Sequence, residues 1–213
     1  MNFDLFPYGG LLNFYSQRSV DRFISKITNI RMDGNNYCVS AIIKSHHPAW
    51  AFQTMIKKRK VKVAYIYRNP VDVFISYWKL LHGFDWNEGP KTDTPYELCV
   101  SPPSGQTMRF QEKTYETYFD RWASHVSAWL EAASQNRNIY IVKYENLIES
   151  FNNEINGLCN NLDIDIISDT IYPSRDDNVI LGTNISLSSE EKTKLDDYCK
   201  LRLNDYPELG SNM

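Results

Sequence analysis

The chain has 213 residues, of which 42% are hydrophobic, and this size and composition suit one well-packed domain spanning residues 1–213. The formal net charge is −3, so the composition does not predict a nucleic-acid-binding surface. No apolar run approaches the roughly 20 residues needed to span a bilayer, so we expect no membrane partner. The cysteines lie far apart without a C-x-x-C pair, as in a cytoplasmic protein with reduced, metal-free thiols.

The N-terminal part of the chain is predicted to alternate between helix and strand. Apolar residues at helical spacing favour a helix over 19–30, followed by an Asp-Gly-Asn-Asn turn. Residues 37–44 are predicted to form a strand, which ends because Pro48 cannot continue regular pairing. Residues 49–58 favour a short helix.

Residues 61–78 read VKVAYIYRNPVDVFISYW and carry the most information in the chain. A β-branched and aromatic run predicts a strand, Asn69 is a good helix N-cap, and Pro70 fits the first helical position. A strand that turns directly into a helix points free N–H groups and the positive helix end beyond the strand. Arg68 adds a planar fork of donors there, and Ser76 adds a hydroxyl two turns on. The pattern predicts a phosphate or sulfate site.

The second half of the chain contains one long segment without periodicity. Residues 83–113 are rich in Gly, Pro, Thr and Asp and are predicted to form a loop, whose length is typical of functional or mobile segments. The remainder favours an amphipathic helix at 114–134, a strand at 138–143 and a helix through 162. An irregular stretch at 163–187 follows. The last helix is predicted to begin at the capping box of Ser188 and Glu191.

Strands that are each followed by a helical segment predict an α/β fold with a parallel β-sheet and helices on both faces. Ligands of such sheets bind beyond the carboxyl ends of the strands. The polar residues expected to converge there are Lys44, His46, Arg68, Tyr144 and Glu145.

These segments resemble the sulfotransferases that use 3′-phosphoadenosine 5′-phosphosulfate (PAPS). The family's Arg-Asn-Pro-x-Asp, with a Ser four residues later, stands here as Arg68 to Asp72 and Ser76. Three weaker segments also look like the family's motifs: Lys44-Ser45-His46-His47-Pro48, the helix with His125 and Trp129, and Tyr144-Glu145-Asn146-Leu147. The resemblance covers residues 37–162 and implies a P-loop NTPase-like sulfotransferase fold.

The resemblance also implies roles for single residues. Arg68 and Ser76 would hold the 3′-phosphate, and Tyr144 would contact the adenine. His46 would act as the general base, with His47 as its rival, and Lys44 would steady developing negative charge. His125 and Trp129 are expected in the core or the wall of the cofactor pocket. We therefore expect a metal-free sulfotransferase that acts on a hydroxyl or amine of a small-molecule acceptor and releases 3′-phosphoadenosine 5′-phosphate (PAP).

Two departures from the family's pattern leave alternatives open. Only Pro7 and Gly10 match the family's phosphosulfate loop, so either this loop is degenerate or the true loop lies upstream of Met1. The family's Arg-Lys-Gly segment is missing, with Arg175 and Gly182 as loose candidates. One alternative is a non-catalytic nucleotide-binding relic. A less favoured one is a P-loop-type small-molecule kinase, whose G-x-x-x-x-G-K-[ST] string is absent from the sequence. The acceptor and the oligomeric state do not follow from the sequence.

Overall fold

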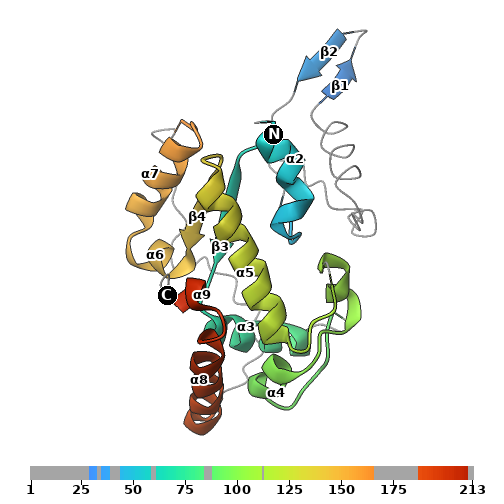
Figure 1. Cartoon of the computed structure of the whole chain (residues 1–213), viewed down its shortest axis with the longest axis vertical. Coiled ribbons are helices and arrows are strands. Elements are labelled where there is room, and N and C mark those ends of the chain that lie inside the picture. The colour runs from blue at the N-terminus through green and yellow to red at the C-terminus, as the bar shows by residue number, and fades with distance from the viewer. Residues whose placement is uncertain are drawn as a thin grey trace.

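The structure is a computed structural model that describes residues 29–32, 35–38, 44–58, 61–83, 88–111, 113–165 and 187–210. At its centre lie two strands, β3 (Val63–Tyr67) and β4 (Ile139–Lys143), with helices packed around them (Figure 1). These strands pair in parallel, so the predicted α/β class with a parallel sheet is confirmed.

The register of β3 and β4 decides where the candidate site lies. Val63 pairs with Ile139 at one end and Tyr67 pairs with Lys143 at the other, so both strands end at the same edge of the sheet. Each strand is followed almost at once by a helix, α3 (Pro70–Gly83) after β3 and α6 (Tyr144–Glu149) after β4. The two junctions therefore stand next to each other.

Helices cover both faces of this parallel pair, as the sequence predicted. Ile139 packs with Trp129 of α5 (Tyr118–Gln135), which lies across one face. Tyr140 points to the other face, where its ring end lies next to Gly157 of α7 (Phe151–Asn161). This opposition follows from the alternation of side chains along a strand.

The main core lies below the sheet edge in Figure 1, between α3, α5 and three further helices, α4 (Pro95–Val100), α8 (Ser189–Leu203) and α9 (Pro207–Gly210). Its fully buried side chains include Phe74, Leu98, Phe119, Leu195 and Leu209. The capping box predicted at Ser188 and Glu191 is present at the start of α8.

The segment at 83–113 is not the irregular loop that the sequence predicted. It contains α4 and a 3-10 helix, η2 (Gly105–Phe110), and it buries Pro95, Leu98 and Cys99 in the core. Thr94 caps α4 by accepting a hydrogen bond from the N–H of Glu97. Helices this short show too few turns for a periodic pattern, which is why the prediction was wrong.

The N-terminal elements also differ from the prediction. Strands β1 (Asn29–Met32) and β2 (Asn35–Cys38) form an antiparallel hairpin that stands apart from β3 and β4 (Figure 1). Of the strand expected over 37–44, the first two positions belong to β2, Lys44 lies in no helix or strand, and residues 39–43 lie outside the described residues. The helix expected over 19–30 lies mostly outside the described residues, and its last two positions belong to β1.

The helices expected at 49–58 and 144–162 are each built from two pieces. A 3-10 helix, η1 (Ala49–Phe52), leads into α2 (Gln53–Lys57). Ser150 separates α6 from α7 because its backbone leaves the helical region, with φ −143° and ψ 50°.

Candidate functional site

The guanidinium of Arg68 lies directly beyond the end of β3 and is held by two neighbours. Its Nη2 donates a hydrogen bond of 2.9 Å to Asp72 in the first turn of α3. Its Cζ lies 4.7 Å from the ring centroid of Tyr144, the first residue of α6, in a cation–π contact. The parallel register thus brings together two residues that the sequence analysis assigned to one cofactor.

The start of α3 is fixed by a side-chain cap and by a contact from the first turn of α6. Asn69 accepts a hydrogen bond of 2.9 Å from the N–H of Asp72 through its side-chain oxygen, which confirms it as the N-cap. Glu145 accepts from the backbone N–H of Asn69 at 3.0 Å and from its side-chain amide at 2.9 Å. The carboxylate therefore joins the two strand–helix junctions.

Two buried polar atoms at this junction have no hydrogen-bond partner, Nε of Arg68 and Oε2 of Glu145. Most buried polar groups in proteins are paired, so an orphan donor on an arginine marks a place where a ligand acceptor fits. The ion pair between Arg68 and Asp72 is partly exposed, with side-chain exposures of 35% and 37%, and pairs of this kind are weak enough to exchange for a phosphate.

Of the other residues assigned to the cofactor, the structure describes only Ser76. Ser76 is exposed on α3, two turns from the cap. Pro7 and Gly10 lie outside the described residues, as do Arg175 and Gly182.

The candidate catalytic residues lie on the extended segment before η1. Lys44 and His46 are both exposed. The ring of His46 contacts Phe110 of η2 edge-on, with 5.4 Å between the centroids. His47, the rival base, is buried at 4% exposure, and Ser45 Oγ lies 2.9 Å from its Nδ1.

His125 and Trp129 of α5 hold this segment against the sheet. The Nε1 of Trp129 and the Nε2 of His125 each donate to the carbonyl of His47 at 3.3 Å. Because a carbonyl only accepts, His125 carries its proton on Nε2, and its Nδ1 accepts from the hydroxyl of Tyr65 at 3.0 Å. Burial, and then the charge of Arg121, lower the pKa of His125 to about 4, so it is neutral at neutral pH. These contacts confirm the expectation that both residues belong to the core or to a pocket wall.

A small cavity of about 30 Å³ lies beside this segment, between α5, η2 and Pro48. Arg121 lines it, with His125 one turn further along α5. The sequence analysis missed Arg121, although its spacing of four residues from His125 places both on one helix face. Burial lowers the pKa of the Arg121 guanidinium.

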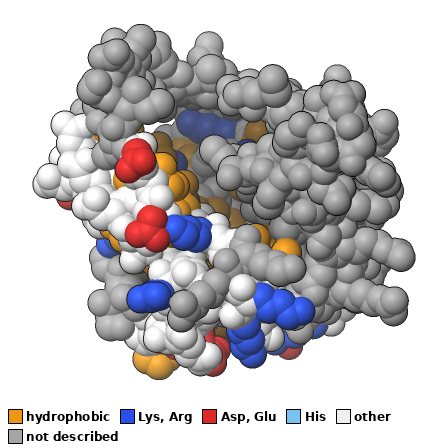
Figure 2. Space-filling view, turned by 90° about the horizontal axis from the view of Figure 1, so that it is seen from above, with side chains coloured by type: hydrophobic (Ala, Val, Ile, Leu, Met, Phe, Trp, Pro, Cys, Tyr) orange, Lys and Arg blue, Asp and Glu red, His pale blue; other side chains and the backbone are white. Residues whose placement is uncertain are grey.

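Figure 2 shows one face of the molecule, on which both acidic and basic side chains of the described residues are visible. Hydrophobic side chains gather around a hollow there, with acidic and basic side chains interspersed around them. Within the described part of the chain, no group of three or more His, Cys, Asp or Glu side chains could hold a metal ion. None of the helices in the described ranges is long and apolar enough to cross a membrane.

Comparisons with known proteins identify the family of the chain. The model of the sulfotransferase domain matches residues 16–199. The chain is 27% identical to sulfotransferase 1 family member D1 of Mus musculus over 150 residues, covering 69% of this chain and 45% of that protein. It is 24% identical to sulfotransferase 2A1 of Macaca fascicularis over 160 residues, covering 75% of this chain and 49% of that protein. The chain thus spans less than half the length of these relatives.

Among solved structures, the crystal structure of mouse sulfotransferase SULT7A1 complexed with PAP matches with a TM-score of 0.43 and 19% identity, over 78% of this chain and 46% of that chain. The domain model covers most of the sequence, including both strand–helix junctions and the segment with His46. The chain belongs to the sulfotransferase domain family.

Proposed function

We propose that this protein is a sulfotransferase that binds PAPS beyond the ends of β3 and β4 and sulfates a small-molecule acceptor. The observation that carries the proposal is the pairing of Arg68 with Tyr144 at the parallel junction. A guanidinium with an unpaired Nε beside the N-terminus of α3 supports an anion site. An aromatic ring next to it supports a base-stacking surface, so the residues present fit a nucleotide with a phosphate.

In this proposal Arg68 and Ser76 hold the 3′-phosphate and Tyr144 contacts the adenine. Pro7 and Gly10 are assigned to the phosphosulfate loop on the resemblance alone. When bound, PAPS supplies the sulfuryl group. Lys44 places a positive charge on the exposed segment before η1, where it would stabilise negative charge that develops during transfer.

His46 is the proposed general base that takes the proton from the acceptor's hydroxyl or amine. It is exposed on the segment before η1, and histidine is the side chain that most often acts as a general base. His47 is a poorer candidate because its ring is buried and its Nδ1 lies at hydrogen-bond distance from Ser45.

The spacing of the cysteines and the small acceptor both suit the cytoplasm, which we propose as the location.

Turnover of PAPS with a panel of phenols, alcohols and amines tests the proposal. His46→Ala should lower the rate by about 10²- to 10⁴-fold, the usual effect of losing a general base. Calorimetry should show that it still binds PAP like the wild type. His47→Gln is the matched control and should retain most of the rate. A wild-type protein that binds PAP but sulfates no acceptor would favour the nucleotide-binding relic instead.

A further inference from the structure

Arg121 of α5 is a half-buried cation without a carboxylate partner among the residues that the structure describes. Its Nε is fully buried and has no hydrogen-bond partner. The groups that act on its charge are the hydroxyls of Tyr77, Tyr118 and Tyr115, together with the cost of burial, which lowers its pKa. A neutral hydroxyl compensates an arginine far less than an ion pair does.

A second arginine of the same bundle shows the usual arrangement. Arg202 of α8 pairs with Asp120 and with Asp205. A buried cation without such a partner destabilises the free protein, and this kind of cost is typical of binding sites. Because no described carboxylate pairs with Arg121, a ligand with a negative charge would compensate this cation.

The cavity next to Arg121 has the size and the walls for such a ligand. Its volume of about 30 Å³ is room for about two waters, which is also the scale of a carboxylate group. Pro48, Phe110 and Tyr115 give it apolar and aromatic walls. His125 also lines it but is neutral at neutral pH, so Arg121 supplies the charge among the described lining residues.

We propose that Arg121 binds a carboxylate of the acceptor, so that the substrates of this enzyme are small aromatic or apolar molecules that carry an acid group as well as the group to be sulfated. This inference rests on the proposed function and names the acceptor class of the same site. The guanidinium fork suits a carboxylate, and the aromatic walls suit the body of the molecule.

A second orphan atom lies in the same cavity. The side-chain Oε1 of Gln111 is buried without a hydrogen-bond partner. Because oxygen and nitrogen of an amide exchange places by a half-turn, Gln111 can donate its NH₂ to the acid once it is bound. Ser124, which lines the cavity one turn from Arg121, offers a hydroxyl.

The cavity is adjacent to the proposed base. Phe110 lines the cavity and also contacts the ring of His46, and Pro48 lies two residues after His46 in the chain. An acceptor with its acid at Arg121 would pass along Phe110 and present its other end toward His46. The acid would then fix the orientation of the molecule for proton removal.

Calorimetry with para-hydroxyphenylacetate and its primary amide, para-hydroxyphenylacetamide, tests the proposal without requiring turnover. The two ligands differ only in charge and hydrogen bonding at one end. The wild type in the presence of PAP should bind the acid about 10- to 100-fold more tightly, the range expected for a charge-assisted hydrogen bond. Arg121→Gln should abolish this preference, Arg121→Lys should keep part of it, and the exposed Arg137→Gln should retain all of it.

Thermal unfolding separates binding from a structural role. Arg121→Gln should melt at the same temperature as the wild type or higher, because it removes a half-buried charge that no described carboxylate compensates. If the wild type binds the acid and the amide with equal affinity, the inference is overturned, but the proposed function is not contradicted. An acid preference that persists at full strength in Arg121→Gln would also overturn it. If the acid preference is present but no acceptor is sulfated, the proposed function fails and the binding site stands.

Discussion

Glu145 accepts two hydrogen bonds from Asn69, one from its backbone N–H at 3.0 Å and one from its side-chain amide at 2.9 Å, although the residues are 76 positions apart. Asn69 in turn caps α3 through the N–H of Asp72. One carboxylate at the end of β4 thus fixes the orientation of the helix that follows β3. Arg68, which is proposed to bind phosphate, precedes Asn69 in the chain and donates a hydrogen bond to Asp72.

Replacing Glu145 should therefore disturb both stability and the nucleotide site. Glu145→Ala leaves the N–H of Asn69 without its acceptor, and we expect a loss of about 1–3 kcal/mol in the free energy of unfolding. Urea denaturation measures this loss, and PAP affinity should fall in the same variant. The control is Glu149→Ala, which changes an exposed glutamate on the same helix. Equal stabilities of the two variants would show that the contact with Asn69 contributes little.

Asp120 should make the stability depend on acid pH. Burial alone would raise its pKa, but hydrogen bonds from Thr117 and Arg202 outweigh burial, and the pKa lies below the ordinary 3.8. The ionised form is thus favoured by folding, so its contribution is present above pH 3.8 and is lost as the pH falls through the lower folded value.

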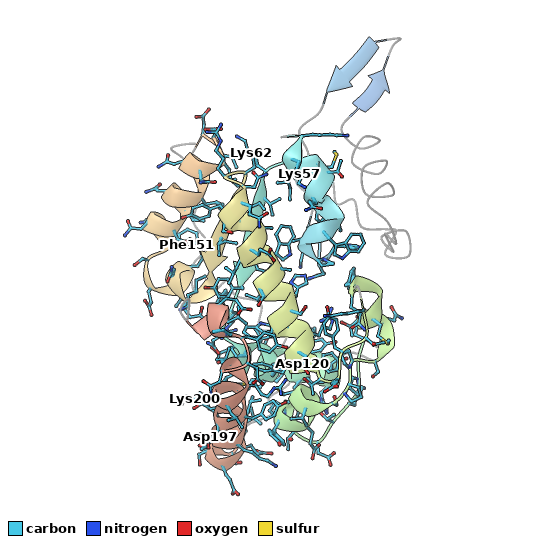
Figure 3. All side chains as sticks on the ribbon, in the orientation of Figure 1. Lys57, Lys62, Asp120, Phe151, Asp197 and Lys200 are labelled. Carbon is cyan, nitrogen blue, oxygen red and sulfur yellow. The ribbon has the colours of Figure 1, made fainter. Side chains whose placement is uncertain are left out.

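Asp120→Asn should accordingly flatten the fall of unfolding free energy below about pH 4. Asp197→Asn is a matched control because Asp197 is exposed. Figure 3 labels both residues, Asp120 on α5 and Asp197 on α8. Urea denaturation from neutral to acid pH makes the comparison. Parallel curves for the wild type and Asp120→Asn would contradict the role of this carboxylate.

Two glycines test the packing at two places, Gly89 at the first turn of α5 and Gly157 of α7 against β4. A Cβ on Gly89 would lie 2.8 Å from the hydroxyl of Tyr118 and 3.0 Å from that of Tyr77. Tyr118 is 2% exposed and cannot move away, so Gly89→Ala should cost about 1–3 kcal/mol. Gly157→Ala should be tolerated, because it meets only the far end of the half-buried Tyr140 and places alanine inside a helix. Thermal melting of both variants measures the difference.

The cysteines should differ in reactivity. Cys99 and Cys199 are buried at 0% and 1% exposure, and burial raises the pKa of the Cys99 thiol. Cys159 on α7 is partly exposed. Native protein treated with iodoacetamide should be alkylated at Cys159 well before Cys99 or Cys199, both of which should react after addition of urea. Mass mapping of the alkylated peptides checks this order, and early labelling of Cys99 would contradict the packing of α4 on α8.

Local sequence signals predicted the parts of the fold that local chemistry determines. The strand, the Asn69 cap and the helix from Pro70 are encoded within about two dozen residues, so their positions were predicted closely. The capping box at Ser188 and Glu191 is equally local. Parallel pairing of β3 with β4 followed from the helices that come after each strand.

Features that depend on distant contacts could not be predicted in this way. The helix α4 has six residues and is held by burial of Leu98 and Cys99 in a core built with α8. Nothing near Arg121 in the sequence shows that no carboxylate among the described residues pairs with it. The pairing of Asp120 with Arg202 spans 82 positions, and only the fold reveals it.

Calorimetric titration of PAP into the wild type, Arg68→Ala and Arg68→Lys tests the central claim most directly. We expect Arg68→Ala to bind about 10- to 100-fold more weakly, the effect of about 1.5–3 kcal/mol for charged hydrogen bonds. Arg68→Lys should also bind less well, because it keeps the charge but loses the fork. Asp72→Asn should bind at least as well as the wild type, since it releases Arg68 from its ion pair. Unchanged PAP affinity in Arg68→Ala would contradict the assignment of the β3–α3 junction as the nucleotide site.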